Sequence, residues 1–142
     1  MNFEYKVEGG DFNNAGNAAS SVKKMLRQIG IDPLLIKKIV VALYEGEVNI
    51  VAHAHMGLIK VEVDTEKLKI ILEDEGPGIP DIDKAMEEGY STASPRVREM
   101  GFGAGMGLPN MKKNTDEFQI ESEVNKGTKV TMINYFQNEI SE

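Results

Sequence analysis

The sequence predicts an α+β fold in which helices pack on one face of a sheet to make a two-layer sandwich. Most of the helical residues come early in the chain, and two strand pairs, each folded around a short turn, follow them. A doubly wound sheet would instead alternate strands with helices along the chain. The grouping of helices before strands therefore favours the two-layer arrangement.

The N-terminal half is expected to hold one strand and two helices. Residues Phe3 to Val7 alternate apolar and polar side chains, which is typical of a strand. Residues Asn14 to Ile29 form a predicted helix with Gly30 as its C-cap. Asp32-Pro33 is a helix start, with an N-cap followed by proline at the first helical position, and this helix is expected to reach about His55. Its broad apolar face carries Leu35, Ile36, Ile39, Val40 and Leu43.

The second half is expected to contain two strand pairs and two short helices. The predicted strands are 58–63, 67–74, 118–124 and 129–135, and the predicted helices are 81–88 and about 108–114. Residues 89–107 show no sustained period.

Length, charge and cysteine content narrow the class of protein. The 142 residues predict one domain, at 1–136, with a frayed tail at 137–142. The absence of cysteine excludes disulfides and thiolate chemistry, and it fits a cytoplasmic location. A net charge of −7 argues against broad nucleic-acid binding. No segment has the pattern of a membrane span or a signal peptide.

The stretch GFGAGMGL, residues 101–108, places glycine at every second position within a basic island. Between residues 91 and 113 four cations stand against the single anion Glu99; the cations are Arg96, Arg98, Lys112 and Lys113. The stretch fits neither the dinucleotide fingerprint nor the Walker A loop. It is either a plain surface loop or an anion site that offers backbone amides to phosphate.

A polar stripe interrupts the long predicted helix. Glu45, Asn49 and His53 are spaced four residues apart and therefore share one face, while Glu47 is assigned to solvent. The stripe is either the wet edge of the helix or a functional set, in which a carboxylate base lies beside an amide oxygen suited to Mg²⁺.

A second polar interruption ends the strand at 67–74. Asp74 follows Leu68, Ile70 and Leu72 on the face that points toward the core, so an ionised carboxylate there needs a donor such as the amine of adenine. The glycines at 76 and 78 allow a sharp turn against a flat ring, although Gly-Pro-Gly also makes ordinary turns.

Taken in order, these places resemble the motifs of the Bergerat-fold (GHKL) ATPases, the superfamily of gyrase, histidine kinases and the mismatch-repair ATPase. Glu45-x-x-x-Asn49 is similar to the N box, and Asp74-x-Gly76-x-Gly78 to the first glycine box. The alternating glycines are similar to the second glycine box, and Gly127-Thr128 to the last box. The resemblance covers residues 33 to 132 and implies a mainly antiparallel, mixed sheet.

Within the superfamily, EGPGIPDIDKAMEEGYSTAS and MGLPNMKKNTDEFQIESEVNKGTKV resemble the small serine/threonine kinases of bacterial partner-switching systems. That resemblance implies an ATP- and Mg²⁺-dependent kinase acting on a small STAS-type antagonist. The alternative is a nucleotide-gated module that sequesters a partner, such as a sigma factor, without useful catalysis. A structural role without nucleotide is a third interpretation, and homodimerisation stays open.

The resemblance also implies roles for the matching residues. Asp74 would bind the adenine amine, Asn49 would hold Mg²⁺ and Glu45 would act as the general base. The remaining ATP-binding candidates are Gly76, Gly78, Ile79, Gly101, Gly103, Gly105, Gly107, Leu108 and Thr128. Arg98 and Lys112 are inferred as phosphate contacts from their charge and position.

Gly46 is an unusual residue for a helix interior, and it directly follows the candidate base Glu45. Glycine there costs about 1 kcal/mol relative to alanine. It either permits the close approach of a neighbouring element or ligand, or it loosens the helix and weakens the base.

Overall fold

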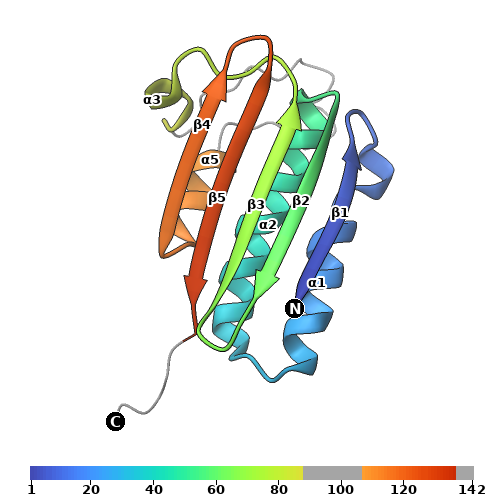
Figure 1. Ribbon diagram of the computed structural model, residues 1–142, viewed down its shortest axis with the longest axis vertical. Coiled ribbons are helices and arrows are strands. Elements are labelled where there is room, and N and C mark those ends of the chain that lie inside the picture. Colours follow the sequence, from blue (N-terminus) through green and yellow to red (C-terminus); the bar gives the residue numbers. More distant parts are fainter. Residues whose placement is uncertain (88–106, 137–142) are drawn as a thin grey trace.

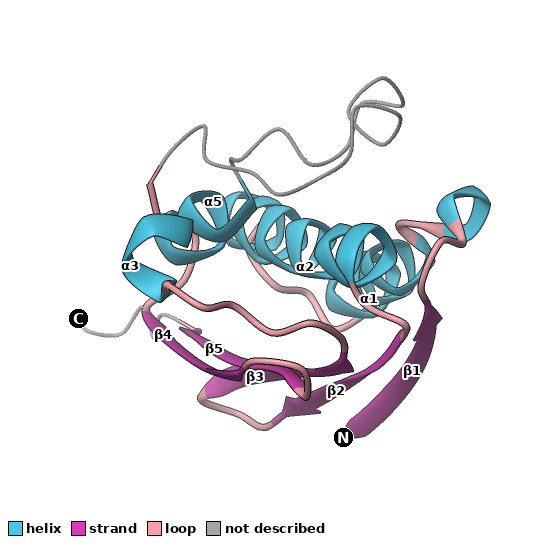
Figure 2. Ribbon diagram, turned by 90° about the horizontal axis from the view of Figure 1, so that it is seen from above, coloured by secondary structure: helices cyan, strands magenta, loops and turns pink. Residues whose placement is uncertain are grey.

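Among the described residues, five strands form one sheet, and helices cover a single face of it, as the computed structural model shows in two views (Figures 1 and 2). The structure describes residues 1–87 and 107–136. Its elements are β1 (Asn2–Glu8), a 3-10 helix (Phe12–Asn14), α1 (Asn17–Gln28), α2 (Pro33–His53), β2 (Met56–Val63), β3 (Lys67–Glu75), α3 (Ile82–Ala85), α5 (Gly107–Lys113), β4 (Glu117–Glu123) and β5 (Gly127–Tyr135).

The sheet confirms the predicted α+β fold class. Its strand order is β1-β2-β3-β5-β4, and each of the four pairings is antiparallel. Both predicted strand pairs are present as the hairpins β2–β3 and β4–β5. None of the helices in the two described ranges is long and apolar enough to cross a membrane.

The first predicted helix begins later than its sequence pattern suggests. Gly16 adopts φ +101° and stands as the N-cap of α1, after the separate 3-10 turn. A Cβ on Gly16 would lie 3.2 Å from the ring of Tyr44 on α2. The chain therefore reorients at this glycine before α1 packs beside α2.

The core lies between the sheet and α2. Leu68, Ile70 and Leu72 of β3 are buried as their alternation predicts. From the helical layer, Ile39 and Leu43 of α2 meet this apolar row. The start of α2 is also as predicted, because the Asp32 carboxylate accepts hydrogen bonds from the backbone N–H groups of Leu34 and Leu35.

The assignment of Glu47 to solvent is wrong. This side chain is only 2% exposed, and its two carboxylate oxygens accept hydrogen bonds of 3.0 Å from the N–H groups of Ala18 and Ala19. Because α1 packs against the side of α2 that carries Glu47, the first-turn amides of α1 meet a carboxylate instead of water. Glu47 is therefore a structural cap supplied by another helix.

Candidate functional site

The polar stripe of α2 faces α5, the helix that follows the glycine-rich stretch. Glu45 and Asn49 are both half-buried. The side-chain amide of Asn110 donates a 3.1 Å hydrogen bond to Oε2 of Glu45. A Cβ on Gly107 would lie 3.1 Å from Oδ1 of Asn49, so the missing side chain lets the start of α5 approach this amide. The end of the second glycine box and the N box are therefore adjacent.

Asp74 lies half-buried at the end of β3, next to the last box. The backbone N–H of Thr128 donates a 3.0 Å hydrogen bond to Oδ1 of Asp74. Burial raises the pKa of the Asp74 carboxyl above its ordinary value, and the Thr128 hydrogen bond offsets part of that rise. Gly127 passes so close to the backbone of Asp74 that a Cβ there would collide with the Asp74 carbonyl oxygen. The first and last boxes thus form one unit.

The turn after β3 is fastened to the turn between β4 and β5. Gly78 has φ +76°, in the left-handed region that favours glycine. The Gly76 N–H donates to the carbonyl of Lys126, and the Asn125 N–H donates to the carbonyl of Pro77. These two reciprocal bonds fix the chain that follows Asp74, at the upper end of β3 in Figure 1.

Ser122 is a site residue that the sequence analysis missed. Its hydroxyl accepts a 2.7 Å hydrogen bond from the Ile79 N–H and lies 2.9 Å from the hydroxyl of Thr128. It also lies 3.1 Å from the carbonyl oxygen of Gly127, to which it donates. The available signal was that Ser122 continues the alternating row of Phe118 and Ile120 at a position where an apolar residue is expected. Asn110 carried no comparable signal in the sequence.

Gly46 has a packing role. A Cβ at this position would lie 2.6 Å from Cδ2 of Leu72 and 3.1 Å from Cε of Met111. Of the two alternatives, the structure therefore shows the close approach of neighbouring elements, with α2 in contact with both β3 and α5. Helix α2 continues without interruption through this glycine.

Some of the remaining candidate site residues lie in the described part of the chain, and the others lie outside it. Lys112 is exposed on the last turn of α5, and Leu108 packs against the core. Burial lowers the pKa of His53 below its ordinary value, which favours a neutral imidazole. The candidates Arg98, Gly101, Gly103 and Gly105 lie outside the described residues.

The oxygen atoms of Glu45 and Asn49 suit a cation that a bound phosphate-bearing molecule also helps to coordinate. Within residues 1–87 and 107–136, no three His, Asp or Glu side chains gather in a way that would hold a metal ion on their own. Asn49 supplies a hard amide oxygen beside Glu45, the donor type that Mg²⁺ accepts together with phosphate oxygens. The residues present therefore fit Mg²⁺ only in company with a phosphate-bearing ligand.

Several named proteins are similar to this chain over most of its length. The serine/threonine-protein kinase RsbT of Bacillus subtilis (strain 168) is 35% identical over 119 residues, which cover 81% of this chain and 84% of the relative. An anti-sigma F factor of Clostridium kluyveri is 33% identical over 132 residues, which cover 88% of each chain.

Solved structures share the fold at low sequence identity. The RsbU and RsbW domains of Rv1364c from Mycobacterium tuberculosis align with a TM-score of 0.64 and 16% identity, over 97% of this chain and 33% of that one. The mycobacterial sensor histidine kinase MprB aligns with a TM-score of 0.54 and 13% identity, over 95% and 97% of the two chains. The histidine kinase-like ATPase domain family matches residues 11–134, which include every motif residue described above. The family expected from the motifs is thereby confirmed: the chain belongs to the histidine kinase-like ATPase domains.

Proposed function

We propose that this chain is an ATP-dependent protein serine/threonine kinase of a partner-switching pathway, with a small STAS-type antagonist protein as its substrate. Membership of the ATPase family and the similarity to a serine/threonine kinase support ATP use and phosphoryl transfer. The observation that carries the proposal is the position of Glu45 and Asn49 beside the start of α5, with Asp74 held separately by Thr128.

Asp74 is suited to recognise the adenine ring. Its Oδ1 is engaged by the Thr128 N–H, and no described residue donates to Oδ2. An exocyclic amine is the kind of donor that a half-buried carboxylate needs, and it would favour the ionised form that burial disfavours. Gly76, Gly78 and Ile79 would line the same ring, because their turn is fixed against Ser122 and Lys126.

Asn49 is suited to the phosphate end of the nucleotide. Its Oδ1 would bind Mg²⁺, which would neutralise phosphate charge in the transfer step. The amides of Gly101, Gly103, Gly105 and Gly107, together with Arg98 and Lys112, are the proposed phosphate contacts. Leu108 and Thr128 complete the proposed binding set.

Glu45 is the proposed general base. The oxygen of a substrate serine or threonine attacks the γ-phosphorus, the bond from that phosphorus to the bridging β–γ oxygen breaks, and ADP leaves. The hydroxyl proton passes to the Glu45 carboxylate. The hydrogen bond from Asn110 to Oε2 leaves Oε1 to face the hydroxyl.

A second candidate function follows from the similarity to anti-sigma F factors. The chain would then bind a partner such as a sigma factor in a nucleotide-dependent way, with or without phosphorylating an antagonist. A cytoplasmic location belongs to the same proposal, because partner switching acts on proteins that control transcription. A homodimer is a separate part of the proposal.

The test separates nucleotide binding from phosphoryl transfer. Purified protein is incubated with Mg-ATP and the STAS-domain proteins of its own organism, and phosphoserine and phosphothreonine are measured. Glu45→Gln should retain nucleotide binding and lose at least about a hundredfold in transfer rate. Asp74→Asn should lose nucleotide binding, and Glu73→Gln, on the opposite face of β3, should match wild type in both assays.

Tight nucleotide binding without transfer to any of these antagonists would reject the kinase and favour the binding module. Identical thermal stability of the wild-type protein with and without Mg-ATP would reject both the kinase and the nucleotide-dependent binding module, because a ligand that binds the native state raises its stability.

A further inference from the structure

One edge of the sheet is open, and its hydrogen-bonding groups can be assigned. Among the described strands, β1 is outermost and pairs only with β2. The Val63 N–H donates a 2.8 Å hydrogen bond to the carbonyl oxygen of Met1. The Gly9 N–H donates a 2.8 Å hydrogen bond to the carbonyl oxygen of His55. Because bonded pairs alternate along an antiparallel ladder, the odd residues of β1 bond to β2 and the even residues direct their N–H and C=O groups outward. Within the described ranges, no hydrogen bond reaches the outward groups of Glu4 or Lys6.

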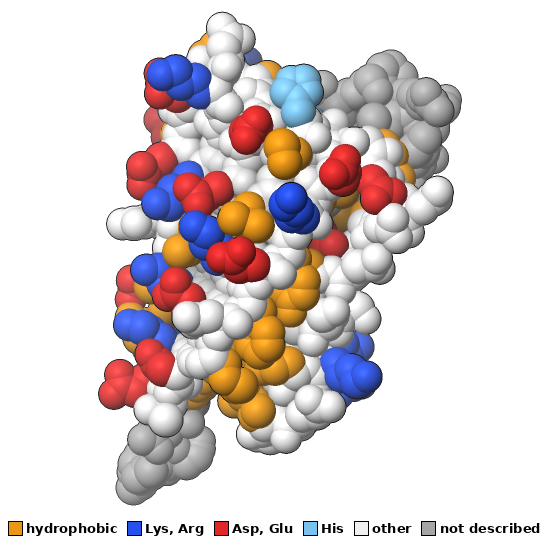
Figure 3. All heavy atoms as spheres, turned by 45° about the vertical axis from the view of Figure 1, so that its right-hand side comes forward, with side chains coloured by type: hydrophobic (Ala, Val, Ile, Leu, Met, Phe, Trp, Pro, Cys, Tyr) orange, Lys and Arg blue, Asp and Glu red, His pale blue; other side chains and the backbone are white. Residues whose placement is uncertain are grey.

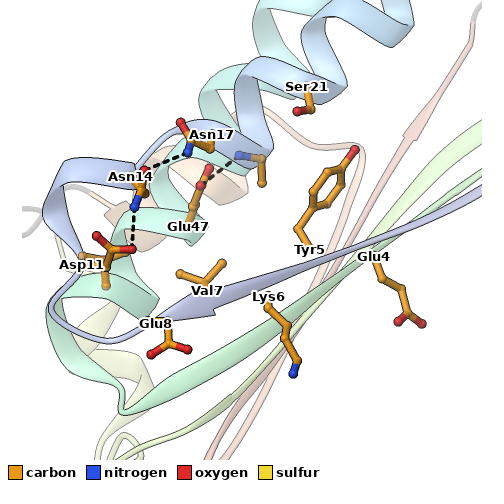
Figure 4. A pocket seen from close by; sticks show the side chains of 12 residues that line it. Glu4, Tyr5, Lys6, Val7, Glu8, Asp11, Asn14, Asn17, Ser21 and Glu47 are labelled. Atoms are coloured by element: carbon orange, nitrogen blue, oxygen red, sulfur yellow. Dashed lines mark hydrogen bonds between the residues drawn. The ribbon is translucent and has the colours of Figure 1, made fainter.

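A groove of about 360 Å³ lies between this edge and α1. The close view in Figure 4 shows Tyr5 and Val7 pointing toward the helix, while Glu4 and Lys6 point to the opposite side of the strand. The helix contributes Asn17 and Ser21, and none of the nucleotide-site residues that the structure describes lines the groove. A strand added to β1 would therefore place every second side chain into this groove.

Beyond the groove, the surface between β1 and α1 becomes apolar. β1 and α1 run in opposite directions (Figure 1), and two strand residues advance about as far as one helical turn. Ser21 thus lies at the level of Tyr5, and Met25, one turn further along the helix, at the level of Phe3. Phe3 and Met25 are half-buried against the core. Beyond them, the hydrophobic side chains of Met1 (59% exposed) and Ile29 (43%) continue the apolar end.

The space-filling view agrees with this description. Figure 3, in which this side of the molecule comes forward, shows hydrophobic side chains gathered in the lower half, with charged side chains beside them. An apolar strip beside unpaired strand backbone is the surface that a strand-forming segment of another protein can use.

The polar end of the groove favours a cation. Asp11 lies there and accepts a 2.8 Å hydrogen bond from Asn14, whereas the carboxylate of Glu8 points to the opposite side of the strand, as Glu4 and Lys6 do. Glu47 also lines this end, but both of its oxygens are taken by the amides of α1. Of the described residues in the lining, Lys6 is the one cation, and its side chain points away.

From this we infer that the open edge of β1 binds an extended segment of a partner protein by strand addition. The segment carries an apolar side chain that packs against Phe3 and Met25, and a lysine or arginine four residues away that reaches Asp11. Main-chain hydrogen bonds to Glu4 and Lys6 supply affinity, and the two side chains supply specificity. A second copy of β1 paired antiparallel about Tyr5 would place its Phe3 at the polar end, opposite Val7.

The test uses two labelled seven-residue peptides and the full chain. Their sequences are Thr-Lys-Thr-Val-Thr-Leu-Thr, for antiparallel addition, and the reverse order, for parallel addition. We expect saturable binding of one of them by fluorescence anisotropy, and slowed hydrogen exchange at the amides of Glu4 and Lys6. A control peptide with Glu in place of Lys should bind at least about tenfold more weakly, because the groove end is acidic.

Two variant pairs locate the site. Ser21→Lys places a cation in the groove and should weaken binding about tenfold, whereas Ser20→Lys, outside the lining, should not. Lys6→Pro removes one outward N–H while keeping the bonds to β2, and should weaken binding relative to Lys6→Thr.

Three results would overturn the inference. The first is that neither peptide binds the wild-type chain saturably. The second is that the Lys and Glu peptides bind equally well, and the third is that the Ser21→Lys variant binds the peptide as tightly as wild type does. A wild-type dimer that Lys6→Pro dissociates, and that excludes the peptides, would overturn it in favour of a second copy. The nucleotide assays above do not depend on any of these outcomes.

Discussion

The side-chain amide of Asn110 on α5 lies 3.1 Å from Oε2 of Glu45 on α2 and donates a hydrogen bond to it. The two residues are 65 positions apart, so only the packing of α5 against α2 brings them together. A donor fixed on one oxygen restricts the rotation of the carboxylate. Asn110 is therefore placed to position the candidate base, without itself contacting the reacting atoms.

Asn110→Ala is expected to lower the rate of phosphoryl transfer about tenfold while leaving nucleotide affinity unchanged, because the base loses its orientation and the adenine site is intact. Steady-state kinetics and nucleotide titration measure the two effects. Asn110→Asp puts a second carboxylate beside Glu45 and should shift the acid limb of the pH–rate profile to higher pH. Wild-type transfer rates and a wild-type pH–rate profile in both variants would contradict the positioning role. Gln119→Ala, on the exposed face of β4, is the control.

Glu47→Gln is expected to destabilise the fold by about 2 kcal/mol, because a buried charged acceptor of two backbone N–H groups becomes a neutral amide with one acceptor. Urea denaturation gives the free energy of unfolding, and hydrogen exchange at Ala18 and Ala19 localises the change. Glu66→Gln, exposed in the β2–β3 turn, should match wild type. A loss confined to about 0.5 kcal/mol would show that the cap contributes little.

Gly46→Ala is expected to destabilise the protein by about 1 kcal/mol. Overpacking against Leu72 and Met111 costs about 1–3 kcal/mol and outweighs the gain of about 1 kcal/mol in helix propensity. A double-mutant cycle with Leu72→Ala, followed by chemical denaturation, checks this. The added methyl should be less destabilising when Leu72 is shortened, and purely additive effects would count against the packing explanation.

His53 is expected to make stability depend on pH. Burial holds its folded-state pKa below the ordinary value of 6.5, so the unfolded chain takes up a proton first as the pH falls. Stability is therefore complete above pH 6.5 and is lost as the pH falls from there toward the folded-state pKa. Urea midpoints measured from pH 7.5 to 5 should fall less steeply for His53→Gln than for wild type. His55→Gln, at an exposed position, should keep the wild-type slope.

The local elements were predictable because each depends on neighbouring residues. Asp32-Pro33 starts a helix through short-range bonds, and the alternation of Leu68, Ile70 and Leu72 defines a buried face before any partner is known. The motif order predicted the family for the same reason, since each box is a short local pattern. Boundaries shifted where a long-range contact intervened, as at Gly16 against Tyr44.

The sequence by itself determined the fold class, the strand faces and the identity of Glu45, Asn49 and Asp74 as the residues to examine. Tertiary structure alone decided what those side chains meet. It paired Glu45 with Asn110, joined Asp74 to Thr128, and turned Glu47 from an expected surface residue into the cap of α1. The physical reason is that a carboxylate's role depends on the donors around it, and here every one of those donors comes from a distant part of the chain.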